Sequence, residues 1–235
     1  DLIISNAHAS AIDLTENFKC DPEKTTFIYN PIDTEKLAKI EPITDFFDPG
    51  YFNIISVGRL EYAKNHELII RALTGFPQAR LYILGKGYLK MELNSLIESL
   101  GLKNRVFLLG FEPNPYQYLK GADLFVLSSN HEGFPNVLLE AMCCGLPILS
   151  TNCKSGPDEM MELKEPKKND IMVTDYGVLV PVGSQDQMKK GLAYCLEDPE
   201  YLKACSLNAK RRILSYEKVT ILSTYEEVLK GEKLI

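Results

Sequence analysis

The 235-residue sequence contains no tryptophan, and its six cysteines and three histidines show no metal-site spacing. No two cysteines form a Cys-x-x-Cys pair, and the histidines lie far from the cysteines along the chain. Structural zinc sites and dithiol redox motifs depend on such short spacings, so neither is predicted. We expect the cysteines to be reduced and to behave as small hydrophobic residues, as in a cytoplasmic protein.

The sequence also lacks long apolar runs and clusters of basic residues. No apolar run reaches the roughly 20 residues that a membrane-spanning helix needs. Asp and Glu number 32 against 26 Lys and Arg, which gives a net charge of -6. Affinity for a phosphate backbone comes from clustered Lys and Arg, so the composition argues against a nucleic-acid binder. An anionic ligand would have to be held by a few local groups.

The first residues show no initiator methionine, basic segment or signal-peptide cleavage site, because Asp1 is followed directly by Leu-Ile-Ile. We expect that the sequence starts inside a longer protein. The content of 45% hydrophobic and 25% charged residues is that of a globular chain and excludes disorder and fibrous repeats.

Short apolar runs rich in branched residues alternate with helical patterns from residue 54 onward. Nearly continuous apolar runs of this length are typical of strands buried on both faces of a parallel sheet. The alternation predicts an α/β fold with a Rossmann-like, doubly wound parallel sheet. The predicted strands are residues 54–57, 81–84, 106–109, 124–127, 148–150 and 178–180, and the predicted helices are 66–73, 88–100, 137–143 and 185–196.

The ends of the chain differ from this central pattern. Residues 2–5 and 25–29 resemble strands and residues 8–18 a helix, whereas Asn30-Pro31-Ile32-Asp33 and the prolines after it are typical of a linker. We therefore predict the tail of a different domain plus a linker over residues 1–42, a main domain over 51–215, and a C-terminal helix within 216–235.

A basic segment, residues 58–65, follows the first strand of the main domain. Arg59 can donate two parallel hydrogen bonds to a phosphate, and Lys64 supplies a second positive charge. Asn65 is a favourable N-cap for the helix that follows, and a helix start attracts anions. The alternative is that both cations are ordinary surface residues and Gly58 only forms a turn.

An acidic pair follows the strand at 124–127. Glu132 precedes a predicted helix in which Pro135 occupies the first turn, and Glu140 lies about one turn inside that helix. Two carboxylates would repel a bare phosphate, so they are better suited to accept hydrogen bonds from hydroxyl groups. The alternative is that Glu132 caps the helix and Glu140 is exposed. Tyr116 and Tyr118 are assigned to packing or to the surface.

Together these motifs resemble the nucleotide-sugar half of the family-4 retaining glycosyltransferases, which have the GT-B fold. The resemblance covers about residues 53–182. It rests on Gly58-Arg59-Leu60 with Lys64-Asn65, Leu84-Gly85-Lys86-Gly87, Leu109-Gly110-Phe111, Glu132-Gly133-Phe134-Pro135 with Glu140-Ala141-Met142, and Gly145-Leu146-Pro147. The two glutamates, separated by seven residues and in register with both upstream cations, form its most specific part.

The resemblance implies a role for each matching position. Arg59 and Lys64 would neutralise the donor diphosphate without a metal or other cofactor, and Glu132 would face the transferred sugar; these three are the expected catalytic residues. Glu140 would accept hydrogen bonds from the ribose, and backbone amides around residues 134–137 would hold the phosphates. The full set of expected substrate-binding residues is Gly58, Gly85, Lys86, Gly110, Phe111, Gly133, Phe134, Pro135, Asn136, Val137 and Glu140.

The implied function is transfer of a sugar from a UDP- or GDP-type donor, with retention, to a glycan or lipid-linked acceptor in polysaccharide, capsule or lipopolysaccharide synthesis. The resemblance also implies peripheral membrane association of the full-length protein, and we expect the fragment to bind donor but to transfer little alone. After Thr151 the sequence departs from the family pattern, so Ser155 and Gly156 are not assigned as donor contacts. Two alternatives remain, a GT-B nucleotide-sugar 2-epimerase and a non-catalytic nucleotide-sugar-binding module.

Overall fold

A seven-stranded sheet forms the centre of the molecule in the computed structural model, which describes residues 2–231. The strand order is β5-β4-β3-β6-β7-β9-β8, and every neighbouring pair is parallel except β8 with β9. The strands are β3 (Phe52–Val57), β4 (Ala79–Leu84), β5 (Val106–Gly110), β6 (Leu124–Leu127), β7 (Ile148–Thr151), β8 (Met172–Thr174) and β9 (Gly177–Val180).

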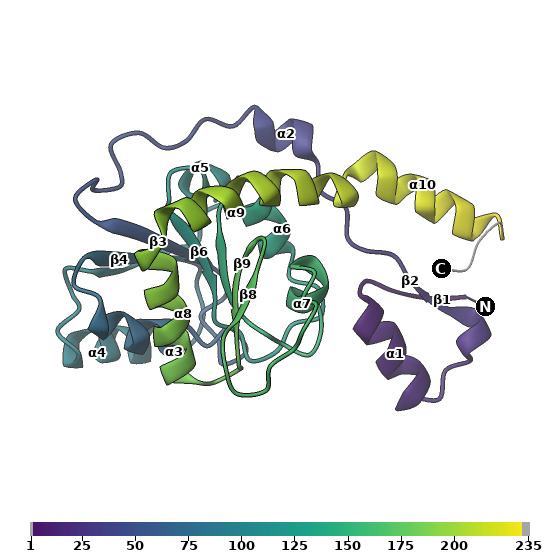
Figure 1. Ribbon diagram of the computed structural model, residues 1–235, viewed down its shortest axis with the longest axis horizontal. Helices are drawn as coiled ribbons and strands as arrows, with labels where there is room; N and C mark the ends of the chain where they lie inside the picture. The colour runs from purple at the N-terminus through teal and green to yellow at the C-terminus, as the bar shows by residue number, and fades with distance from the viewer. Residues whose placement is uncertain (1, 232–235) are drawn as a thin grey trace.

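Helices cover both faces of this sheet (Figure 1). Successive residues of one strand belong to different cores: Ile54 packs in one hydrophobic cluster and Ile55 in the other, and both are fully buried. This explains the continuous apolar strands and confirms the predicted doubly wound α/β fold. One face carries α3 (His66–Ala72), α4 (Lys90–Ser99) and α8 (Gln185–Glu197), and the other α5 (Tyr116–Leu119), α6 (Asn136–Cys143), α7 (Pro157–Met160) and much of α9 (Pro199–Arg212).

The N-terminal residues form a small separate sheet beside the main body (Figure 1). It contains β1 (Ile3–Ser5), α1 (His8–Glu16) and β2 (Thr25–Phe27), with β1 and β2 parallel. The last helix, α10 (Lys218–Leu229), leaves the main body and packs here through Ile221 and Val228 against Ile28. The assignment of these residues to an acceptor domain stays a prediction.

Two chain segments run side by side between the small sheet and the main body. The amide of Ile32 donates to the carbonyl of Tyr216 over 2.8 Å, and the amide of Lys218 donates to the carbonyl of Ile32 over 2.9 Å. The region predicted as a linker also contains a short helix, α2 (Thr34–Ala38), capped by the Asp33 side chain. The linker therefore has local structure of its own.

Helix α9 and strand β8 lie outside the predicted set of elements. Helix α9 begins at Asp198-Pro199, where the Asp198 carboxylate accepts from the amide of Tyr201 over 2.9 Å. This is a sequence signal for a helix start, because the aspartate caps the helix and proline suits the first turn. Strand β8 has three residues and pairs antiparallel at the sheet edge, which is too short a pattern to predict.

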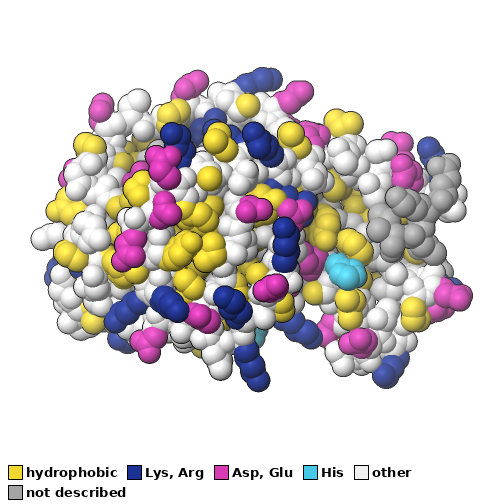
Figure 2. All heavy atoms as spheres, in the orientation of Figure 1, with side chains coloured by type: hydrophobic (Ala, Val, Ile, Leu, Met, Phe, Trp, Pro, Cys, Tyr) yellow, Lys and Arg dark blue, Asp and Glu magenta, His cyan; other side chains and the backbone are white. Residues whose placement is uncertain are grey.

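The surface of the molecule is mixed in charge. Acidic and basic side chains are interspersed on the face shown in Figure 2. Within residues 2–231, no helix combines the length and apolar character required to cross a membrane.

Candidate functional site

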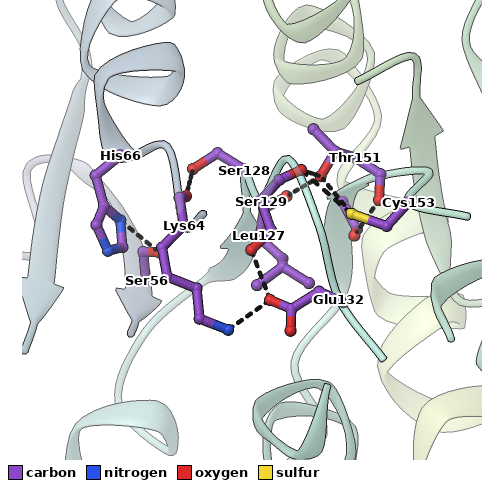
Figure 3. Close-up of polar contacts among 10 residues, drawn as sticks. Ser56, Lys64, His66, Leu127, Ser128, Ser129, Glu132, Thr151 and Cys153 are labelled. Carbon is purple, nitrogen blue, oxygen red and sulfur yellow. Dashed lines mark hydrogen bonds and ion pairs between the residues drawn. The ribbon is translucent and has the colours of Figure 1, made fainter. Parts of the chain in front are cut away.

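The carboxyl ends of β3 and β6 meet where the sheet changes winding direction. From β3 the chain continues to β4 and β5 on one side, whereas β6 leads to β7 and β9 on the other. Crevices at such a point are the usual ligand sites of open α/β sheets. Lys64 follows β3 and Glu132 follows β6, and the Lys64 Nζ lies 2.6 Å from the Glu132 Oε1 (Figure 3). The fold thus brings two of the predicted catalytic side chains into contact across the crevice.

This ion pair is largely withdrawn from solvent and held by neighbouring hydroxyl groups. The exposed fractions of the two side chains are 19% for Lys64 and 9% for Glu132. The Ser129 hydroxyl donates to the same Glu132 oxygen over 2.6 Å, and the Ser128 hydroxyl donates to the Lys64 carbonyl over 3.1 Å. Behind them the buried Thr151 hydroxyl donates to the Ser129 carbonyl over 2.6 Å. Both charges therefore have preset positions (Figure 3).

Asn65 occupies the N-cap position of α3, but its side chain does not cap the helix. The backbone of Asn65 is left-handed, with φ of 43°, and the side-chain amide donates to the Asn130 Oδ1 over 2.9 Å. The backbone amide of Asn130 in turn donates to the carbonyl of Ala63, in the loop after β3, over 2.8 Å. The predicted N-cap position is confirmed, but the side-chain cap is not formed, because Asn65 instead contacts Asn130 and joins the β3 and β6 loops.

Glycines allow the loops after β3 and β4 to touch. A Cβ on Gly85, whose φ is +152°, would lie 1.9 Å from the Gly58 carbonyl oxygen. A Cβ on Gly87 would lie 2.3 Å from the Leu60 oxygen, and one on Gly58 would lie 3.4 Å from the Lys64 side chain. Real Cβ atoms do not tolerate the first two distances. The glycines therefore permit the backbone approach that forms one wall of the site.

A pocket of about 620 Å³ lies at the same rim of the sheet, at the carboxyl ends of β3 and β4. That volume is within the usual range for small-molecule sites. Lys86 Nζ stands 5.0 Å from the centre of the Phe111 ring, which is 65% exposed and forms an open aromatic surface. The lining residues include Gly58, Arg59, Gly85, Lys86, Phe111, Glu112, Tyr116 and Glu140, so six of the predicted site residues share this pocket.

Arg59 lies at the pocket without joining the Lys64–Glu132 pair. Its NH1 contacts the Glu61 Oε1 over 3.0 Å, and its side chain is 73% exposed. An exposed ion pair of this kind contributes little to stability, so the guanidinium can be redirected to a ligand at low cost.

Glu140 is a half-buried carboxylate on α6 that faces the same pocket. Desolvation by burial raises the pKa of Glu140, and a hydrogen bond from Tyr116 acts in the opposite direction. The Tyr116 hydroxyl donates to the Glu140 Oε1 over 3.3 Å. Burial, followed by the adjacent Glu140 charge, raises the pKa of Tyr116 to about 12, so the phenol stays protonated at neutral pH. Assigning Tyr116 only to packing or surface was incomplete, because its partner lies 24 residues away and no local pattern signals the contact.

The start of α6 differs from the prediction by one residue. Pro135 is the N-cap rather than a first-turn residue, and α6 begins at Asn136 with no side-chain cap and no acidic residue in its first turn. Proline has no backbone N–H, so Pro135 cannot donate a hydrogen bond to a phosphate from its backbone. The backbone amides of Asn136 and Val137 can, because the amides in the first turn of a helix lack intrahelical acceptors. The Phe134 side chain is buried and stacks on Tyr29 with ring centres 5.1 Å apart.

A second cavity, of about 630 Å³, separates α1 from the rim of the main sheet. Glu132 lines it together with residues of both units, and Lys154 contacts Asp13 of α1 over 2.5 Å across it. Ser155 is buried, and its hydroxyl lies 3.1 Å from that of Ser10. Glu132 therefore lines this cavity and also contacts Lys64.

Glu159 joins the small sheet to the main body. Its carboxylate accepts from the amides of His8 and Ala9 at the start of α1, over 2.9 and 3.1 Å, and from the Tyr29 hydroxyl over 3.0 Å. The α1 N-cap, Ala7, provides no side-chain cap. The helix is thus capped by a residue about 150 positions away, a contact that sequence spacing does not indicate.

The arrangement combines local positive charge with hydroxyl-accepting groups. Arg59, Lys64 and the start of α6 can hold an anion such as a diphosphate. Glu140 in the pocket and Glu132 at the second cavity can accept hydrogen bonds from hydroxyls. The roles assigned to these residues from the sequence remain predictions.

The sequence model of the family described as glycosyl transferases group 1 matches residues 44–212. That range is more than half of the chain, and the chain belongs to this family.

Known relatives and solved structures agree with this membership. The chain is 39% identical over 222 residues to N-acetylgalactosamine-N,N'-diacetylbacillosaminyl-diphospho-undecaprenol 4-alpha-N-acetylgalactosaminyltransferase of Campylobacter jejuni, which covers 94% of this chain and 58% of that protein. It is 30% identical over 258 residues to an uncharacterized glycosyltransferase of Methanocaldococcus jannaschii, covering 98% and 64%. The structure of Anabaena HepE in complex with UDP and glucose superposes with a TM-score of 0.83 at 28% identity, covering 97% of this chain and 62% of that chain. The chain thus spans about 60% of the length of these curated relatives.

Proposed function

We propose that this chain is the donor-binding part of a retaining glycosyltransferase that uses a nucleoside diphosphate sugar. The observation that carries the proposal is the Lys64–Glu132 pair at the switch point of the sheet, on the same rim as a 620 Å³ pocket that Arg59 and Glu140 line. The diphosphate would lie against Arg59, Lys64 and the start of α6, the nucleoside in the pocket, and the sugar near Glu132.

Breaking the bond between the sugar and the diphosphate increases negative charge on the leaving group. Cations and backbone amides that are already in place stabilise this charge more strongly than they stabilise the bound donor, which lowers the barrier. Lys64 is suited to this task because Glu132 and the Lys64 backbone contact with Ser128 hold it in position. No metal or other cofactor is needed in this scheme.

We propose UDP as the nucleotide and a lipid-linked saccharide as the acceptor. The HepE structure, which contains UDP, supports the first, and the acceptor in the name of the Campylobacter relative supports the second. With such an acceptor, the enzyme would act in surface-polysaccharide synthesis at the cytoplasmic face of a membrane. Since the chain spans about 60% of its relatives, we expect it to bind donor but transfer sugar slowly by itself.

Calorimetric titration with UDP tests the donor site. We expect Arg59→Ala and Glu140→Ala each to weaken UDP binding about tenfold, which is 1.4 kcal/mol. Arg71→Ala is the matched control, because Arg71 also pairs with a nearby glutamate on the surface, over 2.7 Å. Unchanged UDP affinity in both site variants would refute the assignment. Consumption of a UDP-sugar by the full-length protein without acceptor, yielding an epimer, would favour the epimerase instead.

A further inference from the structure

Tyr116 and Glu140 come from different helices and meet in the nucleoside pocket. Tyr116 is the first residue of α5, and Glu140 is the fifth residue of α6. Both line the 620 Å³ pocket with Phe111, and the 3.3 Å bond joins the Tyr116 hydroxyl to the Glu140 Oε1. The tyrosine therefore contacts the carboxylate that the proposed function assigns to the ribose.

The two carboxylate oxygens of Glu140 have different surroundings. Oε1 accepts from Tyr116, whereas Oε2 has no hydrogen-bond partner within residues 2–231. A carboxylate that is pinned through one oxygen presents the other in a single orientation. Two adjacent hydroxyl groups, as on a ribose, can then donate to Glu140 without first ordering its side chain.

The ring and the hydroxyl of Tyr116 make different contacts. The ring packs, partly buried, against the hydrophobic cluster on the α6 side of the sheet. The hydroxyl donates the hydrogen bond to Glu140, so phenylalanine would keep the ring packing and remove the hydrogen bond. Tyr118, two residues along the same helix, packs against the same cluster and stacks edge-on against Phe46 with ring centres 5.0 Å apart.

We propose that Tyr116 is a positioning residue that orients Glu140 toward the ribose diol and thereby makes the site prefer ribonucleotides over 2′-deoxyribonucleotides. This inference rests on the proposed function, because it assumes that the nucleoside occupies this pocket. Tyr116 acts through Glu140 and needs no direct contact with the transferred sugar. The high pKa of Tyr116 is consistent with its role as a donor at neutral pH.

Binding of UDP and of 2′-deoxyuridine diphosphate to the 235-residue chain tests the proposal by calorimetry. We expect Tyr116→Phe to weaken UDP binding about tenfold and to weaken binding of the deoxy analogue less than about twofold, so that the preference falls about five- to tenfold. Tyr118→Phe is the control and should leave both affinities and their ratio unchanged. Thermal unfolding of Tyr116→Phe checks that packing is retained.

The outcomes distinguish this inference from the proposed function. A wild-type preference in Tyr116→Phe, or an equal loss for both nucleotides, overturns the role of Tyr116. If Glu140→Ala abolishes the preference while Tyr116→Phe retains it, the nucleoside site stands and only Tyr116 is misassigned. If Glu140→Ala leaves UDP affinity and preference intact, Glu140 does not bind the ribose and this inference fails; the donor-site assignment fails as well only if Arg59→Ala also leaves UDP affinity unchanged. A reduced preference in Tyr116→Phe and Glu140→Ala, with Tyr118→Phe unchanged, supports both.

Discussion

Removing the positive charge of Lys64 should destabilise the protein even without a ligand. Replacing Lys64 by methionine keeps the aliphatic stem but leaves the Glu132 carboxylate, only 9% exposed, with the Ser129 hydroxyl as its remaining partner among residues 2–231. Breaking a fully buried pair costs roughly 3–5 kcal/mol. Lys64 is 19% exposed and Ser129 still donates to Glu132, so we expect a loss of about 2–3 kcal/mol.

Thermal and urea unfolding of the wild type, Lys64→Met, Glu132→Gln, the double variant and a control would measure this effect. For a chain of this size, roughly 2–4 °C per kcal/mol converts the loss to a fall in Tm of about 4–12 °C. The double variant Lys64→Met with Glu132→Gln should be more stable than Lys64→Met alone, since it no longer buries an unpaired charge. Lys103→Met is the matched control: Lys103 pairs with Glu98 over 2.7 Å, but both side chains are more than half exposed, so the loss should stay below about 0.5 kcal/mol.

Two results would refute this reasoning. A loss below about 1 kcal/mol in Lys64→Met would mean that water reaches Glu132 freely. Strict additivity of the Lys64 and Glu132 substitutions would mean that the 2.6 Å contact carries no coupling energy.

Three further predictions concern the scaffold around the site. Gly85→Ala should lower the free energy of unfolding by several kcal/mol and abolish UDP binding, because its Cβ would lie 1.9 Å from a backbone oxygen. Gly75→Ala is the control: a Cβ there has nothing within 4 Å, so thermal melts and UDP titrations should stay near wild type. Equal stability of the two variants would contradict the close approach at Gly85. His66 is buried, and desolvation lowers its pKa to about 4. Between pH 6.5 and pH 4 the unfolded chain therefore binds a proton at this residue that the folded protein does not bind. Stability should fall as the pH drops through this range. Between pH 7 and pH 5 we expect the titration of His66 to lower the free energy of unfolding, measured with urea, by about 2 kcal/mol. If His66→Gln keeps the pH dependence of the wild type, His66 is not the cause of this loss. Glu159→Ala should accelerate hydrogen exchange of the Ala9 amide at least tenfold, as the start of α1 loses its acceptor, and unaltered exchange would argue against this remote cap.

Much of the fold was predictable because periodicity is a local property. Strands such as residues 124–127 are apolar throughout, which indicates burial on both faces, and the helix patterns between them predict the parallel winding. Gly58 directly follows a strand and Glu132 lies in the loop after another, which also placed them at one rim, since parallel strands end on the same edge. The elements that were missed are short, like β8, or follow local start signals that were not used, like Asp198 before α9.

The site was less predictable where it depends on long-range contacts or on backbone angles. Asn65 has the residue type of a cap, but its left-handed backbone turns the side chain to Asn130. Pro135 has the residue type for a first turn, but the helix begins one residue later. In both cases the local preference is worth about 1 kcal/mol or less, which a few tertiary contacts outweigh.

The sequence by itself determined the layers, the direction of the strands and the rim on which the charged residues lie, because each follows from the order of apolar and polar residues along the chain. Only the tertiary structure decided which charges meet. The contact of Lys64 with Glu132, of Tyr116 with Glu140, and of Glu159 with the start of α1 each joins residues at least 24 positions apart. Such pairs form when packing of the whole sheet brings distant loops within hydrogen-bond reach, and no pattern of residue types within one segment encodes that distance.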